Sequence, residues 1–183
     1  MKQSAVFLDR DGTIIHDKGY LKSVSDVEFY PETFDCLLKL QKYYQLFVIT
    51  NQSGISKGIT SKSEVEIVNN FIVEALKLNG VNIVRVFCCP HATEDYCTCK
   101  KPSPYFIHQA AKEFDIKLEG SYIIGDHPSD VECGRNAGIN SIYLLTGHGD
   151  KHKNEVDMSF PICNNLTEAT ELIIKKINLN YGS

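Results

Sequence analysis

Short, largely apolar segments recur along this chain of 183 residues, and helical patterns separate them. Continuous apolar runs are typical of strands that are covered on both faces, as they are in a parallel sheet. Five segments fit this description: Ala5–Leu8, Leu46–Ile49, Ile83–Phe87, Tyr122–Ile124 and Ser141–Leu145. We therefore expect a central parallel sheet of about five strands.

The segments between these runs carry helical spacing together with start and stop signals. Ser61 and Glu64 form a capping box, and Gly138 is placed to end a helix. Helical patterns cover residues 31–41, 61–76, 103–114, 128–137 and 166–177. Alternating strands and helices predict a single α/β domain of Rossmann-like topology with right-handed crossovers. We expect this domain to cover residues 1–177 and a frayed tail to cover residues 178–183.

Charge and hydropathy exclude several classes of function. The net charge of −4 and the pI of about 5.9 lack the basic character that a nucleic-acid or membrane-surface partner favours. No apolar stretch approaches the roughly 18 residues of a membrane helix, and the N-terminus does not resemble a signal peptide. We therefore expect a cytoplasmic protein, acting as a monomer, with no nucleic-acid or membrane partner.

Polar side chains follow several of the predicted strands at the point where each strand ends. In open α/β sheets, ligands bind outside the carboxyl ends of the strands, so these side chains should meet at one edge. The groups in question are Asp9 and Asp11, Thr50, Lys101, and Asp126 with Asp130.

The chemistry of these groups points to phosphate esters. Asp9 and Asp11 leave an extended strand on the same side, and clustered carboxylates suit Mg²⁺ that is completed by a substrate phosphate. One aspartate can attack phosphorus, while another protonates the leaving alcohol and then activates water. Lys101 and the Thr50 hydroxyl suit the phosphoryl oxygens. The Asp9–Asp11 motif alone would favour a capped turn with solvated carboxylates, but four motifs in order favour a phosphatase.

Four segments resemble the signatures of the haloacid dehalogenase superfamily of phosphatases, and together they span nearly the whole chain. They are Phe7–Thr13, Val48–Asn51, Lys101–Pro102 and Gly125–Asp130. The chain has no spare segment for the mobile cap domain that many members of this superfamily carry. An open site would suit a small phosphorylated metabolite.

The resemblance also implies a role for each of the residues at the strand ends. Asp9 would be the nucleophile and Asp11 the general acid and base, while Thr50 and Lys101 would bind the phosphoryl group. Asp9, the backbone carbonyl of Asp11 and Asp126 would hold Mg²⁺, with Asp130 in a supporting position.

A cluster of cysteines precedes Lys101. Cys89, His91, Cys97 and Cys99 lie within eleven residues and form the ligand set of a closed, structural Zn²⁺ site. A disulfide is disfavoured in the cytosol, and unligated buried cysteines do not fit so polar a segment. A metal would fold the zinc loop, residues 89–99, and so fix Lys100 and Lys101.

This zinc loop resembles one branch of the superfamily, which contains histidinol-phosphate phosphatases and heptose bisphosphate phosphatases. The segments around Asp17 and Ser53 look like the heptose enzymes, whereas the five-residue spacing between His91 and Cys97 looks more like the histidinol enzymes. We expect removal of the 7-phosphate from a heptose 1,7-bisphosphate, with histidinol phosphate or another small phosphosugar as the alternative.

The resemblance implies a set of substrate contacts: Asp17, Gly19, Tyr20, Asn51, Gln52, Ser53, Lys100 and His127. Two of these depart from the family pattern, because Lys100 replaces an arginine and His127 a lysine. A lysine cannot make the planar bidentate contact of an arginine. We expect His148 and His152, in the loop after the last strand, to be solvated surface residues.

Overall fold

The computed structural model describes residues 2–181 and contains one six-stranded parallel sheet in the order β3-β2-β1-β4-β5-β6. The strands are β1 (Ala5–Leu8), β2 (Gln45–Asn51), β3 (Ile83–Cys89), β4 (Tyr122–Gly125), β5 (Asn140–Leu144) and β6 (Ile162–Cys163). The expected parallel α/β architecture is confirmed. The sixth strand has only two residues, too few for an apolar pattern to reveal it.

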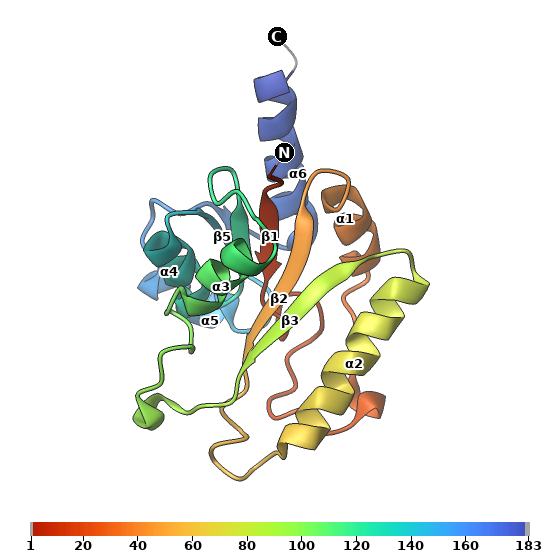
Figure 1. Cartoon of the computed structure of the whole chain (residues 1–183), viewed down its shortest axis with the longest axis vertical. Coiled ribbons are helices and arrows are strands. Elements are labelled where there is room, and N and C mark those ends of the chain that lie inside the picture. Colours follow the sequence, from red (N-terminus) through yellow and green to blue (C-terminus); the bar gives the residue numbers. More distant parts are fainter. Residues whose placement is uncertain (1, 182–183) are drawn as a thin grey trace.

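Helices cover both faces of the sheet (Figure 1). They are α1 (Thr33–Leu40), α2 (Lys62–Leu78), α3 (Tyr105–Glu113), α4 (Pro128–Ala137), α5 (Gly149–His152) and α6 (Leu166–Tyr181), with 3₁₀ turns η1 (Val24–Asp26), η2 (Thr93–Asp95) and η3 (Lys153–Glu155). Strand β1 shows why two layers are needed. Val6 and Leu8 pack toward α1, α2 and α6, whereas Ala5 and Phe7 pack toward α3 and α4. Both faces of an apolar strand are thereby buried.

The predicted helix signals correspond to real caps. The Ser61 amide donates to the Glu64 carboxylate at 2.6 Å, and the Glu64 amide donates back to the Ser61 hydroxyl at 3.2 Å. Helix α4 ends at Gly138, whose φ of +70° is a conformation that glycine adopts without steric cost.

Helix α6 is longer than expected. A tail was predicted from residue 178, but the helix continues to Tyr181 and its C-terminal end projects from the body of the molecule (Figure 1). Leu166, Ala169 and Ile173 anchor its first half in the core. The sequence from Ile177 onward contains no glycine or proline before Gly182, so nothing local stops the helix earlier. Residues 182 and 183 of the predicted tail lie outside the described part of the chain.

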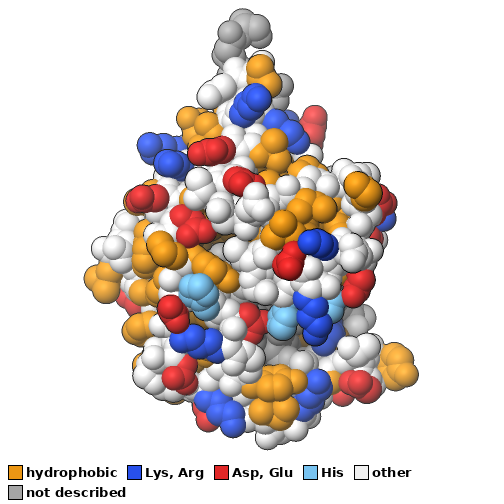
Figure 2. All heavy atoms as spheres, turned by 180° about the vertical axis from the view of Figure 1, so that it is seen from behind, with side chains coloured by type: hydrophobic (Ala, Val, Ile, Leu, Met, Phe, Trp, Pro, Cys, Tyr) orange, Lys and Arg blue, Asp and Glu red, His pale blue; other side chains and the backbone are white. Residues whose placement is uncertain are grey.

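The long connection between β1 and α1 folds back onto the sheet rather than forming a separate cap. Ile14, Ile15 and Leu21 are buried in the main core, and Ile15 bridges to Phe29. Within residues 2–181, no helix has the length and apolar character needed to cross a membrane. Figure 2 shows a face on which basic and acidic side chains are interspersed rather than gathered by sign.

Candidate active site

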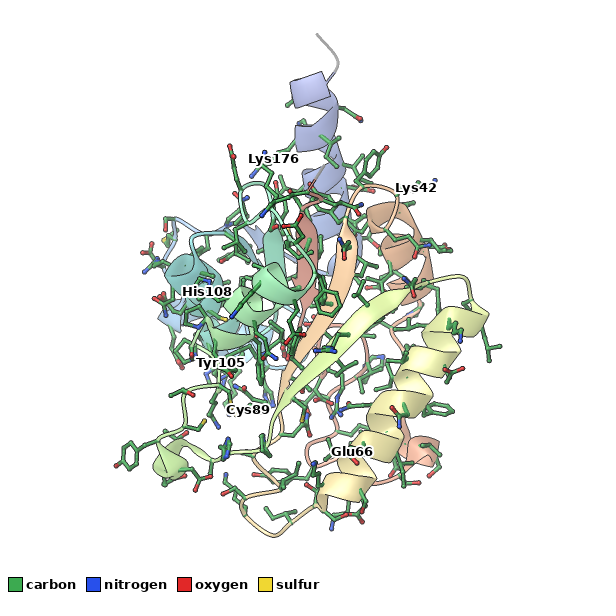
Figure 3. The ribbon with its side chains drawn as sticks, viewed as in Figure 1. Lys42, Glu66, Cys89, Tyr105, His108 and Lys176 are labelled. Carbon is green, nitrogen blue, oxygen red and sulfur yellow. The ribbon has the colours of Figure 1, made fainter. Side chains whose placement is uncertain are left out.

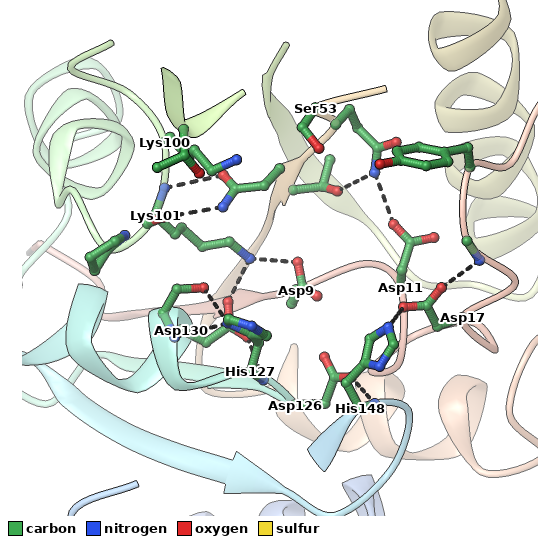
Figure 4. Close-up of a pocket in the computed structure, with 18 residues that line it drawn as sticks. Asp9, Asp11, Asp17, Ser53, Lys100, Lys101, Asp126, His127, Asp130 and His148 are labelled. Atoms are coloured by element: carbon green, nitrogen blue, oxygen red, sulfur yellow. Dashed lines mark hydrogen bonds and ion pairs between the residues drawn. The ribbon is translucent and has the colours of Figure 1, made fainter. Parts of the chain in front are cut away.

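The polar groups at the strand ends converge on one cavity of about 680 Å³ (Figure 4). Parallel strands all present their carboxyl ends at the same edge, and this register brings together residues that are more than a hundred positions apart. The lining contains all six of the predicted strand-end residues: Asp9, Asp11, Thr50, Lys101, Asp126 and Asp130.

Lys101 lies at the centre of the site. Its Nζ is 2.5 Å from a carboxylate oxygen of Asp9 and 2.5 Å from one of Asp130, and it donates to the Ile49 carbonyl at 2.9 Å. The side chain is almost completely buried. Burial by itself would lower the pKa of Lys101, but the carboxylates of Asp130 and Asp9 raise it above its ordinary value. Lys101 therefore stays charged and holds Asp9 in place.

Three buried carboxylates crowd around this lysine. Asp9, Asp126 and Asp130 each offer an oxygen atom within 4.8 Å of the other two. Burial, together with Asp9 and Asp130, raises the pKa of Asp126 to about 9. Burial raises the pKa of Asp130 to about 6 even though Lys101 opposes the shift. One lysine cannot neutralise three carboxylates, so this donor set fits a divalent cation with oxygen preference, such as Mg²⁺.

The Asp126 carboxylate packs directly against the backbone of two glycines. A Cβ atom at Gly12 or at Gly147 would collide with the Asp126 carboxylate, and both residues have positive φ, +79° and +53°. The backbone amide of His148 donates to the same carboxylate at 2.7 Å. Backbone from two distant loops therefore fixes the orientation of Asp126.

Asp11 lies on the other side of Asp9 and is held by a different set of donors. Gln52 Nε2 donates to Asp11 Oδ2 at 2.9 Å and to the Thr50 hydroxyl at 2.7 Å. Burial raises the pKa of Asp11, although the neighbouring Arg10 opposes the shift. This carboxyl group therefore binds a proton more readily than a solvated aspartate does. The alternative of a capped turn with solvated carboxylates does not describe this motif.

The residues expected to contact substrate all line the cavity, but some have partners within the protein. They are Asp17, Gly19, Tyr20, Asn51, Gln52, Ser53, Lys100 and His127. Both polar atoms of the Asn51 side chain bond the Lys101 backbone, at 3.1 and 3.3 Å. Lys100 Nζ donates to the His91 carbonyl at 3.3 Å. Lys100 therefore braces the zinc loop and Asn51 braces the backbone of Lys101 just after it, while both also line the cavity.

His148 was expected to be a solvated surface residue; its side chain is indeed 53% exposed, but it also has a partner in the site that was not predicted. Its Nε2 lies 2.9 Å from Asp17 Oδ2, and the residue forms part of the cavity wall (Figure 4). His152 is also not free, because its Nδ1 lies 2.7 Å from Glu155 and its ring is 5.3 Å from the ring of His127. Burial and His152 lower the pKa of His127.

Thr93 and Ser129 also line the cavity and were missed by the sequence reasoning. Ser129 is the second residue of α4, and its amide donates to the ring of His127 at 3.2 Å. The predicted helix begins directly after His127, and this could have indicated that Ser129, in its first turn, also lies at the site. Thr93 begins η2 in the zinc loop, and no local pattern marks it.

The cysteine cluster is assembled as expected. The Sγ atoms of Cys89, Cys97 and Cys99 are 3.2 to 3.8 Å apart, and His91 Nδ1 is 3.6 Å from Cys89 and 3.5 Å from Cys99. Donors placed about 2.3 Å from one ion at tetrahedral angles are separated by roughly 3.8 Å. Figure 3 shows Cys89 at the end of β3, where the chain turns into the zinc loop. The four residues fit a structural Zn²⁺, and Cys88 lies outside the cluster.

Besides leading into Lys101, the zinc loop supports the segment directly after β2, where Gln52 and Ser53 line the cavity. The backbone N–H of Gln52 donates to the Cys89 carbonyl at 2.7 Å, and the backbone N–H of Ser56 donates to the Pro90 carbonyl at 3.1 Å. The Ser56 hydroxyl also donates to Asp95 at 2.5 Å. The segment after β2 is therefore docked directly on the zinc loop.

A parallel α/β sheet with clustered carboxylates and a buried lysine at its carboxyl edge is an arrangement suited to phosphoryl transfer. Comparison with known proteins agrees with this class. The HAD-hydrolase-like family model matches residues 98–169. A D-glycero-beta-D-manno-heptose-1,7-bisphosphate 7-phosphatase of Helicobacter pylori is 42% identical over 172 residues, which cover 92% of this chain and 96% of the relative. A D-glycero-alpha-D-manno-heptose-1,7-bisphosphate 7-phosphatase of Photorhabdus laumondii is 35% identical over 184 residues, covering 94% and 97%.

Solved structures give the same result. A D,D-heptose 1,7-bisphosphate phosphatase from B. bronchiseptica, complexed with magnesium and phosphate, superposes with a TM-score of 0.87 at 26% identity, covering 95% of this chain and 99% of that one. The chain therefore belongs to the haloacid dehalogenase-like hydrolases and is a phosphatase of that superfamily.

Proposed function

We propose that this phosphatase removes the 7-phosphate of D-glycero-D-manno-heptose 1,7-bisphosphate through an aspartyl-phosphate formed on Asp9. The observation that carries the chemistry is the geometry at the end of β1. Asp9 is held by Lys101 at 2.5 Å, while Asp11, two residues further on, sits in a separate environment that raises its pKa. Two carboxylates with different environments are suited to different tasks, one as nucleophile and one as proton carrier.

In the first step, an oxygen of Asp9 attacks phosphorus, the new P–O bond forms and the bond to the sugar oxygen breaks. Asp11 gives its proton to that leaving oxygen, so that an alcohol departs. Lys101 and the Thr50 hydroxyl bind the phosphoryl oxygens, where negative charge is concentrated during transfer. The position of Lys101 beside Asp9 supports this assignment.

In the second step, water attacks the phosphorus of the aspartyl-phosphate. Asp11, now ionised, accepts a proton from that water, the P–O bond to Asp9 breaks and inorganic phosphate forms. The enzyme returns to its starting state with Asp11 protonated. The same residue thus serves as acid and then as base, and Gln52 and Arg10 hold it in position for both.

The carboxylates of Asp9 and Asp126, with the Asp11 backbone carbonyl, would hold Mg²⁺, and Asp130 would support Lys101 behind them. A bound Mg²⁺ would supply positive charge beside the phosphoryl group. The zinc ligands Cys89, His91, Cys97 and Cys99 would hold Zn²⁺ in a structural role, because their set leaves no open position.

The substrate assignment rests on the printed activity of the relatives and on the cavity walls. The two relatives described above act on different anomers, so the similarity does not choose between the alpha and beta sugar. Asp17, Tyr20 and Ser53 line the cavity, and we assign the sugar to them. Lys100 and His127 line the same cavity, and we assign the second phosphate to them.

The experiment that tests this proposal is phosphate release in the presence of Mg²⁺, with heptose 1,7-bisphosphate and histidinol phosphate compared side by side. The Asp9→Asn variant serves as the blank, and both anomers of the sugar are assayed. We expect kcat/KM to favour the heptose by about 100-fold, which corresponds to roughly 2.7 kcal/mol of transition-state binding. A preference for histidinol phosphate would contradict the substrate assignment while leaving the phosphatase chemistry intact. Turnover by Asp9→Asn near the wild-type rate would contradict the nucleophile.

A further inference from the structure

Arg10 stands between the two aspartates of the first motif, and its side chain is turned inward. The residue is only 1% exposed, which makes it the largest fully buried side chain of the described residues. A buried guanidinium is costly unless its donors are paired. Arg10 pairs them in two directions, toward Asp11 and toward helix α2.

The contact with Asp11 is a two-pronged one. Arg10 Nε donates to Asp11 Oδ2 at 3.0 Å, and Nη2 donates to Oδ1 at 3.0 Å. A planar guanidinium in this fork sets the plane of the carboxylate as well as its distance, which a single hydrogen bond cannot do. The Gln52 contact fixes the carboxylate from a second direction.

The third nitrogen of the Arg10 guanidinium contacts Asn69, which is 59 positions away in the sequence. Arg10 Nη1 donates to Asn69 Oδ1 at 2.7 Å. Asn69 lies in the middle of α2, on the face that also buries Val65, Val68 and Ile72. A polar side chain on the apolar face of a helix needs a partner inside the protein, and the guanidinium of Arg10 is that partner.

We propose that Arg10 and Asn69 act as positioning residues that aim the Asp11 carboxyl group at the leaving oxygen of the substrate. This inference rests on the role of Asp11 in the proposed function. Asn69 fixes Nη1, and the rigid guanidinium transmits that constraint to both oxygens of Asp11. Proton transfer requires a defined distance and direction, and a misplacement of about 1 Å can cost roughly 10²-fold in rate. Helix α2, which does not line the cavity, thereby contributes to the chemistry.

The leaving group provides a test that separates positioning from general stability. A sugar or histidinol phosphate releases a primary alcohol, which needs a proton, whereas p-nitrophenyl phosphate releases a nitrophenolate, which does not. The quantity to compare is kcat/KM, because it reports steps only up to formation of the aspartyl-phosphate and omits the later hydrolysis. The alkyl ester is whichever of heptose 1,7-bisphosphate and histidinol phosphate the wild-type protein turns over faster.

The informative variant is Asn69→Leu, which keeps the approximate volume and removes the acceptor of Arg10. We expect kcat/KM for the alkyl phosphate to fall by about 30-fold, less than the roughly 10²- to 10⁴-fold attributed to general acid catalysis because the acid is misdirected rather than removed, and that for p-nitrophenyl phosphate to change by less than about 3-fold. Asn69→Asp keeps an acceptor oxygen and should restore most of the alkyl phosphate activity. Asn70→Leu, at an exposed position of the same helix, is the matched control and should have no effect.

Equal losses on both esters would show a merely structural role and overturn the proposal, as would unchanged activity on both. If Asn69→Leu does not fold, Asn69→Asp and Arg10→Lys are compared instead, and only Arg10→Lys should lose alkyl phosphate activity selectively, because lysine cannot form the fork. Asp11→Asn is measured in parallel. If that variant loses both esters equally, the proton role of Asp11 is wrong and the positioning role is overturned with it. If Asp11→Asn is selective and Asn69→Leu is not, only the positioning role fails.

Discussion

At the scale of single residues, the site concentrates negative charge where little water can reach it. Asp126 is 2% exposed and faces Asp9 and Asp130, and its carboxylate accepts a hydrogen bond from the His148 amide. Charged carboxylates in such a place repel one another, and in the metal-free protein protonation relieves the repulsion. The same charge that destabilises the metal-free protein is what gives the site its affinity for a cation.

This charge predicts a pH dependence of stability in the metal-free protein. The folded-state pKa of Asp126 is raised to about 9, against about 3.9 in the unfolded chain, so the folded state binds the extra proton between these values. The free energy of unfolding measured in buffer without added Mg²⁺ or chelator, with zinc retained, should therefore fall as the pH rises from about 4 toward about 9. Excess Mg²⁺ should flatten this slope. Asp126→Asn should also flatten it without Mg²⁺, and a slope unchanged in that variant would contradict the assignment.

Gly147 offers a second test at the same scale. Gly147→Ala would place a methyl group against the Asp126 carboxylate in a backbone of positive φ. Gly58→Ala is the matched control, because Gly58 has a φ of +66° and nothing within 4 Å of its added Cβ. Both variants should lose about 1–2 kcal/mol of unfolding free energy from backbone strain. Only Gly147→Ala should also lose about 10²-fold in kcat/KM, since it displaces a carboxylate of the site. Similar activity in the two variants would argue against a tight fit around Asp126.

At the scale of elements, the zinc loop connects two walls of the cavity. The loop leads directly into Lys101. It also holds the segment after β2 in place through the Ser56–Asp95 and Gln52–Cys89 hydrogen bonds. The loop has few apolar residues of its own, so we expect a bound metal to be the main source of its order.

Cys97→Ser tests this connection. We expect the variant to lose bound zinc, to unfold at a temperature lower by roughly 4–8 °C (about 2 kcal/mol), and to lose activity because Lys101 is less well fixed. Metal analysis, thermal melting and kcat/KM measure the three effects. Cys88→Ser changes a neighbouring cysteine outside the cluster and should keep its zinc. Full zinc content in Cys97→Ser would refute the ligand set.

The elements themselves could largely be predicted from the sequence. Apolar runs located five of the six strands to within a few residues, and the capping box at Ser61 and the stop at Gly138 located helix ends, because each of these signals lies within one short segment. Strand β6 and the last turn of α6 were not predicted. A two-residue strand is defined only by its pairing with β5, and no local stop signal marks the end of α6.

In the molecule as a whole, the cavity wall includes contacts between segments far apart in the chain. Asp17, in the connection after β1, meets His148, in the loop after β5, across 2.9 Å. This pair ties the connection that would hold the sugar to the loop that orients Asp126. The wall it forms exists only when both ends of the chain are folded onto one sheet. That the protein works as a cytoplasmic monomer stays a prediction from its sequence.

His148→Ala should loosen this wall without removing the backbone amide that Asp126 accepts from. We expect KM for the sugar phosphate to rise by about 10-fold and kcat to change by less than about 3-fold, because a positioning contact to the substrate loop is lost while the reacting groups stay in place. His108→Ala, an exposed histidine on α3 (Figure 3), is the control and should leave both constants unchanged. A large fall in kcat with unchanged KM would place His148 in the chemistry instead.

Residues close together in the chain were enough to predict the class of fold, the four motifs and the candidate ligands of both metals. Examples are Asp9 with Asp11 and Cys97 with Cys99, whose spacing limits what they can do. The folded structure was needed to find that Arg10 is held by Asn69, that Asn51 is bonded to the Lys101 backbone, and that His148 meets Asp17. Each of these is a contact between distant segments, and its geometry exists only after the parallel sheet has brought their ends to one edge.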